Sequence, residues 1–245
     1  MLRTDDLFIN NYKIIQDTDS FCFGTDAVLL AHFAKVKRKD FVCDIGSGNG
    51  IIPLLLCGLY NPCHIDGFEI QENSFNLFAK NINLNSLDEK ISPINIDINL
   101  LSDEYNEKYD VVVTNPPYKK ALTGIENPTD AKKIARHEIF LTLENLIKKS
   151  SEILKQNGRF YMINRPERLC ETLNFMEKYN VIPKNLCFVH SKISKRPKMF
   201  LIEGRKSVND GLVIMPPIYL FDENNNESEI SKRIYSFMRE GKNNG

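Results

Sequence analysis

The stretch FVCDIGSGNG, residues 41–50, decides the fold of this chain. Its first half is a short apolar run, typical of a buried strand. Its second half spaces three glycines two residues apart, and glycine allows a sharp turn and a close backbone approach to a ligand. The apolar residues 51–60 that follow have the length of a helix. The stretch therefore predicts a strand, a glycine-rich turn and a helix.

Strand-like and helix-like segments alternate along the rest of the chain. The predicted strands are residues 64–70, 91–98, 109–114, 159–164, 186–191 and 199–203. The predicted helices are residues 73–85, 138–156 and 166–179. Repeated βαβ units form a mostly parallel, twisted sheet with helices on both faces. The last two strands flank the basic turn KISKRPK and predict a C-terminal antiparallel hairpin, so the fold class is α/β and Rossmann-like.

Composition sets the broad class of protein. The chain has 245 residues, of which 42% are hydrophobic, enough for one large core. We expect a cytoplasmic protein without a membrane segment, because the longest apolar run is too short to span a bilayer and the first residues lack a signal peptide. Six cysteines form no CxxC pair and are predicted to be reduced and structural. No metal site and no obligate protein partner are expected.

Charge is distributed unevenly along the chain. Residues 40–130 carry 5 Lys and Arg against 14 Asp and Glu, whereas residues 131–206 carry 17 against 7. Residues 184–206 are the densest part, with seven basic residues and one acid. Such a run is either a solvated surface or a face that binds a polyanion.

Acidic residues stand at the ends of three successive predicted strands. In a doubly wound sheet, ligands bind at the carboxyl ends of the strands. Asp44 precedes the glycines, Glu69 follows 19 residues after Gly50, and Asp97 ends the next strand. The glycine spacing is GxGxG and departs from the GxGxxG of dinucleotide sites. Three such acids suit a nucleoside cofactor without phosphates, although Glu69 could be a surface carboxylate and Asp97 a helix cap.

This pattern resembles the class I S-adenosylmethionine-dependent methyltransferases over about residues 24–164. The resemblance implies that Gly46 and Gly48 lie under the methionine part of the cofactor, Glu69 on the ribose and Asp97 near the adenine. The segment FCFGTDAVLLAHF resembles the part that closes over the methionine end. The implied cofactor-binding residues are Gly24, Thr25, Asp44, Gly46, Gly48, Gly50, Glu69 and Asp97.

The strand at residues 109–114 runs into Asn115, Pro116, Pro117 and Tyr118. Two prolines cannot continue a sheet. The tetrad resembles that of enzymes that methylate planar nitrogens, either the exocyclic amine of adenine or the side-chain amide of glutamine. The Asn115 oxygen and the Pro116 carbonyl could each accept one N–H, and Tyr118 could stack on a base. These four residues are the predicted catalytic residues; the structural alternative is a strand terminator beside an incidental aromatic ring.

A narrower resemblance covers nearly the whole chain. The segments NPPYKKALTGIENPTDAKKIARHEI, INRPERL and LVIMPPIYLFDE, with the basic hairpin, resemble the bacterial transfer-RNA adenine-N6 methyltransferases that act beside the anticodon of a valine tRNA. This resemblance implies tRNA as the partner. One departure is Lys119, where an aromatic residue is expected after the tetrad. The predicted substrate-binding residues are Lys119, Arg136, Lys192, Lys195, Arg196 and Lys198.

The chain is predicted to consist of three segments, and two other functions remain open. Residues 1–39 form an N-terminal segment with a helix that closes over the cofactor, residues 40–206 the methyltransferase core, and residues 207–245 an extension packed on the core with a flexible tail. One rival is a glutamine methyltransferase of release factors, which would not need the basic hairpin. The other is a non-catalytic RNA-binding protein with a vestigial cofactor fold.

Overall fold

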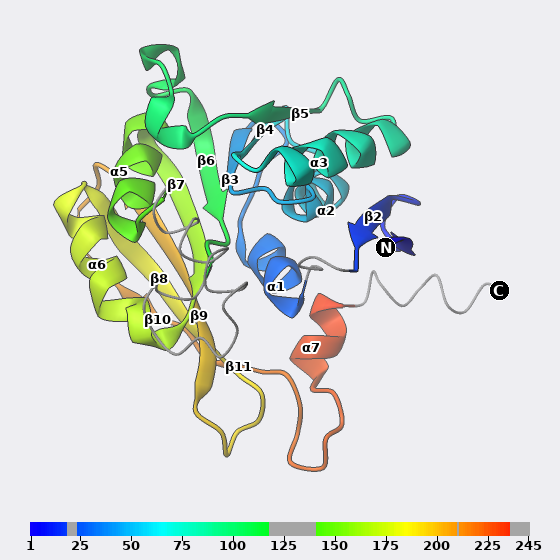
Figure 1. Ribbon diagram of the computed structural model, residues 1–245. Helices are drawn as coiled ribbons and strands as arrows, with labels where there is room; N and C mark the ends of the chain where they lie inside the picture. Colours follow the sequence, from blue (N-terminus) through cyan, green and yellow to red (C-terminus); the bar gives the residue numbers. More distant parts are fainter. Residues whose placement is uncertain (19–23, 118–140, 210, 236–245) are drawn as a thin grey trace, which may run out of the picture.

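The computed structural model describes residues 1–18, 24–117, 141–209 and 211–235 (Figure 1). The helices are α1 (Thr25–Phe33), α2 (Ile51–Tyr60), α3 (Glu72–Leu84), α5 (Leu143–Ile153), α6 (Leu169–Lys178) and α7 (Glu229–Ile234), with short 3-10 turns η1 (Ile98–Leu100), η2 (Asp103–Tyr105) and η3 (Pro166–Arg168). The strands are β1 (Leu2–Asp6), β2 (Lys13–Asp17), β3 (Phe41–Ile45), β4 (His64–Glu69), β5 (Ile91–Asn95), β6 (Tyr109–Thr114), β7 (Leu154–Asn164), β8 (Val181–His190), β9 (Pro197–Lys206), β10 (Val213–Ile214) and β11 (Ile218–Tyr219).

The main sheet has the order β10-β8-β9-β7-β6-β3-β4-β5, and β11 also pairs with β8. Strands β3 to β7 pair in parallel, whereas β9 runs antiparallel to both β7 and β8. From β3 the chain first builds outward through β4 and β5 and then returns to place β6 on the other side of β3. This reversal of order is the position where α/β sheets bind ligands. The predicted fold class, including the C-terminal antiparallel hairpin, is confirmed.

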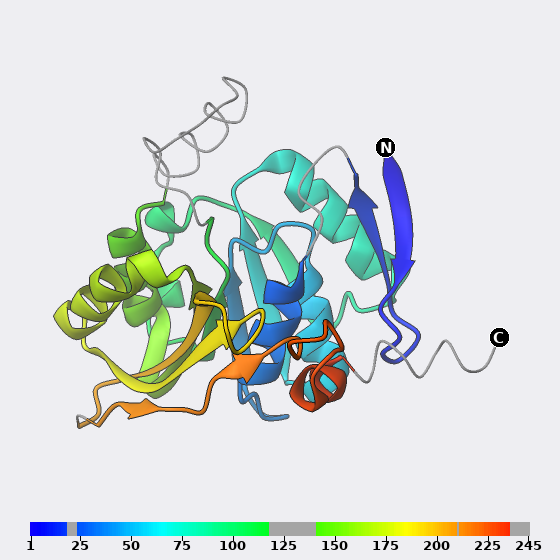
Figure 2. The same cartoon turned by 90° about the horizontal axis from the view of Figure 1, so that it is seen from below.

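Helices cover both faces of the sheet (Figures 1 and 2). One apolar core joins α1, α2 and α3 to the sheet and contains Leu54, Phe78 and Val113. The other joins α5 and α6 to the opposite face and contains Ile147 and Phe160. Side chains on neighbouring strand positions point to opposite faces, so each central strand contributes to both cores. The two cores fix the sheet rigidly beneath its carboxyl edge.

The N-terminal hairpin of β1 and β2 was not predicted. It packs against α3 through side-chain amides: Asn81 accepts from the backbone N–H of Ile15 and donates to its carbonyl, and Asn85 does the same for Lys13. The turn of the hairpin holds Asn10 and Asn11 at positive φ, 50° and 59°. Asparagine tolerates positive φ better than most residues, so Asn10 and Asn11 were a weak signal for a turn at this position.

Several predicted boundaries were wrong. The strands predicted to begin at residues 159, 186 and 199 begin earlier, at Leu154, Val181 and Pro197. The helix predicted from residue 166 begins as the 3-10 turn η3, and α6 follows from Leu169.

The helix predicted over residues 138–156 ends at Ile153, because β7 begins at Leu154 and pairs with Tyr109 before a bulge shifts the register at Val111. Residues 138–140 lie outside the described part. The strand predicted over residues 91–98 ends at Asn95. The chain then turns into a 3-10 helix that Asp97 caps.

The C-terminal extension lies along the core. Strands β10 and β11 each pair with β8, and α7 contacts both β11 and α1 (Figure 1). Within the residues that the structure describes, no helix is both long and apolar enough to cross a membrane.

Candidate active site

The glycine-rich turn between β3 and α2 forms the centre of the site. Gly46, Gly48 and Gly50 all have positive φ, at 77°, 57° and 86°. A Cβ on Gly50 would lie 2.1 Å from the Phe78 ring, so glycine is needed there for packing. A Cβ on Gly46 or Gly48 would meet no atom within 4 Å. These two glycines therefore border open space at the carboxyl edge of the sheet.

Asp44, the next-to-last residue of β3, is completely buried. Among the described residues, neither of its carboxylate oxygens has a hydrogen-bond partner. Burial raises the pKa of Asp44 to about 7; the Ser47 side chain opposes this rise and the charge of Glu69 adds to it. A buried carboxyl group without partners is costly. Both Asp44 oxygens are therefore available to accept a hydrogen bond from a ligand hydroxyl group or to contact a ligand cation.

Glu69, the last residue of β4, is 5% exposed. Its Oε2 accepts from the backbone N–H of Gly48 at 2.8 Å, and its Oε1 accepts from the N–H of Gln71 at 2.7 Å. The carboxylate therefore holds the glycine-rich turn against the start of α3. Its position beside the turn agrees with contact to a ligand there, in addition to this structural role.

Asp97 acts as a helix cap in the described structure. Its Oδ1 accepts from the backbone N–H of Asn99 at 2.9 Å and from the side-chain amide of Asn99 at 2.8 Å. Of the two roles open for Asp97 on sequence grounds, capping is the one that the contacts display.

Asn115 follows β6 at the same edge. Strand β6 lies beside β3, with Thr114 opposite Ile45, and the Thr114 hydroxyl donates to the Ile45 carbonyl at 2.9 Å. The strand ends of Asp44 and Asn115 are therefore fixed side by side. Asn115 and Pro116 are half-buried, and Pro117 is exposed. The amide and the Pro116 carbonyl can reach a ligand at this edge, while the prolines restrict the backbone.

Asp26, in the first turn of α1, was missed by the sequence analysis. Its Oδ2 accepts from the side-chain amide of Asn115 at 3.1 Å, although the two residues are 89 positions apart. Gly24 and Thr25, which precede it, are exposed. The sequence did contain a signal for Asp26, because its carboxylate directly follows Gly24 and Thr25, two predicted site residues.

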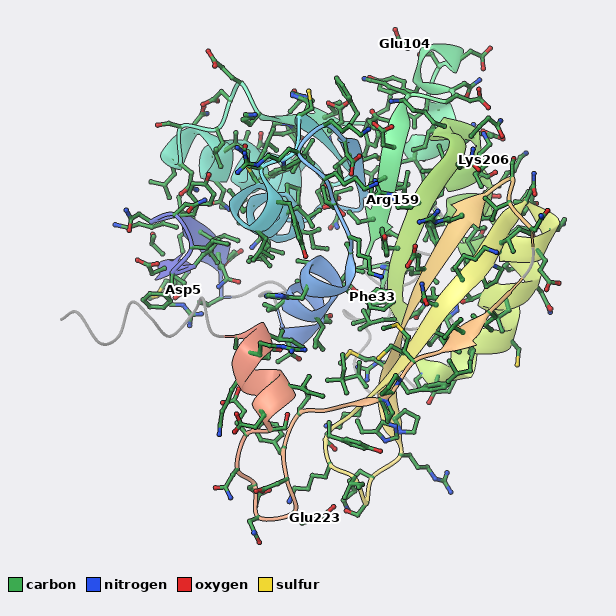
Figure 3. The ribbon with its side chains drawn as sticks, turned by 180° about the vertical axis from the view of Figure 1, so that it is seen from behind. Asp5, Phe33, Glu104, Arg159, Lys206 and Glu223 are labelled. Carbon is green, nitrogen blue, oxygen red and sulfur yellow. The ribbon has the colours of Figure 1, made fainter. Side chains whose placement is uncertain are left out.

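The basic hairpin extends from the same edge, because β8 runs in the direction of β7 and turns into β9 there. Lys195, Arg196 and Lys198 are exposed. Lys192 instead donates to the carbonyl oxygen of Glu223 at 3.0 Å, and the Glu223 carboxylate accepts from the Ser194 N–H and hydroxyl. These hydrogen bonds, followed by the nearby lysine charges, lower the pKa of Glu223. Figure 3 shows Glu223 at the end of the molecule opposite to Glu104 and Lys206.

Three predicted site residues, Tyr118, Lys119 and Arg136, lie outside the described residues. The structure brings most of the others together in two groups. Asp44, the glycines, Glu69 and Asn115 meet at the switch point, where the unpredicted Asp26 joins them, and the hairpin residues lie farther along the same edge. Asp97 lies apart from both groups, as the cap of η1 after β5. In the described ranges, no group of three or more His, Cys, Asp or Glu side chains could hold a metal ion.

S-Adenosylmethionine, the cofactor that the resemblance implies, fits these features. Gly46 and Gly48 leave free the volume that side chains would fill. The buried Asp44 carboxylate offers two acceptor oxygens to a polar group entering that volume. The buried carboxylates Asp44 and Glu69 supply acceptors, which suit the hydroxyl groups and positive charge of this nucleoside.

Comparison with known proteins agrees with the geometry. Residues 17–189 match the family model for the methyltransferase small domain. The tRNA1(Val) (adenine(37)-N6)-methyltransferase of Porphyromonas gingivalis is 30% identical over 211 residues, covering 83% of this chain and 82% of the relative. The protein of the same name from Histophilus somni is 26% identical and covers 96% of this chain and 97% of its own length.

Solved structures share the fold at low identity. A predicted O-methyltransferase from Agrobacterium tumefaciens superposes with a TM-score of 0.71 at 15% identity, covering 86% of this chain and 96% of its own. The tRNA m1G37 methyltransferase of Methanocaldococcus jannaschii superposes with a TM-score of 0.58 at 19% identity, covering 85% of this chain and 57% of its own. The match to the family model covers most of the sequence, and the site geometry agrees with it. The chain therefore belongs to the methyltransferase small domain family.

Proposed function

We propose that this protein transfers a methyl group from S-adenosylmethionine to the exocyclic N6 amine of an adenine in tRNA, next to the anticodon. The observation that carries the proposal is the placement of Asn115 and Pro116 at the strand end beside the glycine-rich turn. The relatives named as tRNA1(Val) (adenine(37)-N6)-methyltransferases support the same substrate.

The chemistry explains why an amide and a carbonyl are needed. The lone pair of an exocyclic amine is delocalised into the base, so the nitrogen is a poor nucleophile. The Asn115 oxygen and the Pro116 carbonyl each accept one N–H, which turns the amine and directs its lone pair toward the methyl donor. The prolines hold both acceptors in place before the substrate arrives.

The remaining roles follow from position. Bound S-adenosylmethionine supplies an electrophilic methyl group on a sulfonium. Gly46 and Gly48 would border its methionine part, Glu69 its ribose and Asp97 its adenine. Asp44 offers buried acceptors nearby. The methylated amine is strongly acidic before it loses its proton, so that proton can pass to water without a side-chain base.

Positive charge on the β8–β9 hairpin supports tRNA as the substrate. Lys195, Arg196 and Lys198 are exposed on the hairpin at the same edge as Asn115, where they can contact phosphates. An adenine in the anticodon loop is poorly paired, so moving it out of its stack into the site costs little. Lys119, Arg136 and a stacking Tyr118 remain part of the proposal on sequence grounds. The proposed substrate places the reaction in the cytoplasm.

Methyl transfer to unmodified tRNA tests the proposal. Purified protein and labelled S-adenosylmethionine are incubated with tRNA that lacks the modification, with a release-factor fragment in parallel, and the products are identified by mass spectrometry. N6-methyladenosine in the tRNA, reduced to a trace with Asn115→Ala, is the expected result. Label in the protein fragment would instead assign the site to glutamine, and label in neither would overturn the proposed function.

A further inference from the structure

The carboxylate of Asp26 lies against the side-chain amide of Asn115. The Oδ2···Nδ2 distance is 3.1 Å, and Asp26 is only 6% exposed. Asp26 belongs to α1 and Asn115 to the end of β6. The contact therefore joins the N-terminal helix to the strand end that carries the proposed chemistry.

The chemistry of the two groups fixes the orientation of the amide. An ionised carboxylate only accepts hydrogen bonds, whereas an amide has one donor end and one acceptor end. The NH₂ end of Asn115 must therefore face Asp26, since the opposite orientation would place two oxygens against each other. The Oδ1 of Asn115 is consequently directed away from α1.

Asp26 is itself held firmly. Its Oδ1 accepts from the backbone N–H of Ala27 at 2.9 Å, and its place in the first helical turn suits a negative charge. The Tyr235 hydroxyl, just after α7, donates to the Thr25 carbonyl at 3.3 Å, so the end of α7 braces the start of α1 (Figure 1). Farther along α1, Phe33 packs edge-to-face on Tyr161 of β7 at 5.9 Å.

We propose that Asp26 is a positioning residue that locks the Asn115 amide with its oxygen toward the substrate amine. This inference rests on the proposed function, because the oxygen end is needed only where the substrate presents an N–H group, as the N6 amine of adenine does. An amide free to flip would offer NH₂ to the amine for part of the time, and each such encounter would be unproductive. Asp26 acts through Asn115 and makes no contact with the methyl group in this scheme.

Asp26→Asn tests the role with almost no change in shape. The new amide can donate to the Asn115 oxygen as well as accept from its NH₂, so both orientations become allowed. We expect kcat to fall by up to about 100-fold, because a small misplacement of a reacting group can cost that much in rate. The dissociation constants for S-adenosylmethionine and tRNA and the melting temperature should stay near those of the parent protein.

Two further variants sharpen the test. Asp5→Asn makes the same chemical change at a half-buried carboxylate of β1, which accepts from Arg3 and Gln16, and should leave kcat unchanged. In an Asn115→Ala background, Asp26→Asn should cause no additional loss in single-turnover rate. Full additivity of the two changes would show that Asp26 acts independently of Asn115 and would overturn the inference.

A measurement without turnover separates this inference from the proposed function. The side-chain amide of Asn115 can be assigned in a ¹H–¹⁵N spectrum by its loss in Asn115→Ala. In Asp26→Asn, its two proton signals should shift or exchange, whether or not tRNA is the substrate. An unchanged amide signal, a weaker affinity for S-adenosylmethionine or a large fall in melting temperature would each reject the positioning role.

Discussion

The Glu69 carboxylate accepts a hydrogen bond from the backbone N–H of Gly48 at 2.8 Å, so the end of β4 holds the glycine-rich turn of its neighbour β3. Glu69→Gln keeps the size of the side chain but turns one acceptor into a donor that faces a backbone N–H. We expect the unfolding free energy to fall by about 1–3 kcal/mol and the affinity for S-adenosylmethionine to fall at least on the order of tenfold. Denaturant titration and calorimetry measure both, and the exposed Glu72→Gln should change neither.

Asp44 should make cofactor binding depend on pH. Its pKa is raised to about 7 in the folded protein by burial, against about 3.9 in an unfolded chain. An ionised carboxylate is the better acceptor, so the affinity for S-adenosylmethionine should rise as the pH rises through 7, with release of a proton on binding. Asp44→Asn should weaken binding and flatten the profile, whereas Asp88→Asn should preserve it. Calorimetry in buffers of different ionisation enthalpy counts the protons.

The Asp44 carboxyl group should also make the unfolding free energy depend on pH, but this quantity should fall, not rise, as the pH increases. Between pH 4 and 7 the folded protein retains a proton on Asp44 that the unfolded chain has lost. The stabilisation linked to this proton is therefore complete below pH 4, is lost as the pH rises to 7 and stays constant above it. Cofactor-free Asp44→Asn should lack this decline, so its stability should exceed that of the parent at pH 8. An equal pH dependence in both proteins would show that Asp44 titrates normally.

Gly67 on β4 lies under the ring of Phe78. A Cβ at this position would approach the ring to 2.4 Å and the Ser47 hydroxyl to 2.7 Å, and Phe78 is completely buried. Gly67→Ala should cost about 1–3 kcal/mol of unfolding free energy by overpacking. Adding Phe78→Leu should recover part of that loss, although Phe78→Leu alone is destabilising. Strictly additive effects in denaturant titrations would count against the steric explanation.

Arg159, labelled in Figure 3, forms a buried ion pair with Asp40, with 2.6 Å between Nη2 and Oδ2. The same carboxylate oxygen accepts from the Lys37 N–H. Arg159→Met should cost about 3–5 kcal/mol, because it leaves a buried charge without its partner. The double variant with Asp40→Asn should be more stable than Arg159→Met alone. Chemical denaturation of the four proteins in this cycle gives the coupling energy directly.

The hairpin lysines should differ in their contribution to tRNA binding. Lys195 is exposed, whereas Lys192 is tied to the Glu223 carbonyl. Lys195→Ala should reduce the slope of log K against log salt by about 0.7–0.9, and Lys192→Ala should reduce it less. Filter binding between low and moderate salt measures the slopes. Equal slopes for the two variants would mean that the bond to Glu223 opens when tRNA binds.

The parts of the fold that were predicted correctly depend on short-range patterns. The glycines after β3 and the prolines after β6 each restrict the backbone locally, so their positions could be inferred from a few residues. The start of β7 could not be inferred in this way, because an apolar residue such as Leu154 fits a helix and a strand equally well. Its pairing with Tyr109, 45 positions earlier in the chain, decides between the two. Asp26 was missed for a similar reason. Its partner Asn115 is 89 residues away, and only the packing of α1 on the sheet brings them together.

The short strands β10 and β11 have a consequence for the behaviour of this protein in solution. β8 has ten residues and borders the sheet, and its outer backbone groups are met by residues after 212: Met215 donates to Leu186, and Leu220 to His190. A long open strand invites pairing with another molecule. A chain trimmed after Lys206 would expose that edge, and it should aggregate even where its active site is intact. The C-terminal extension thus covers an edge of β8 that would otherwise be open to pairing with another molecule.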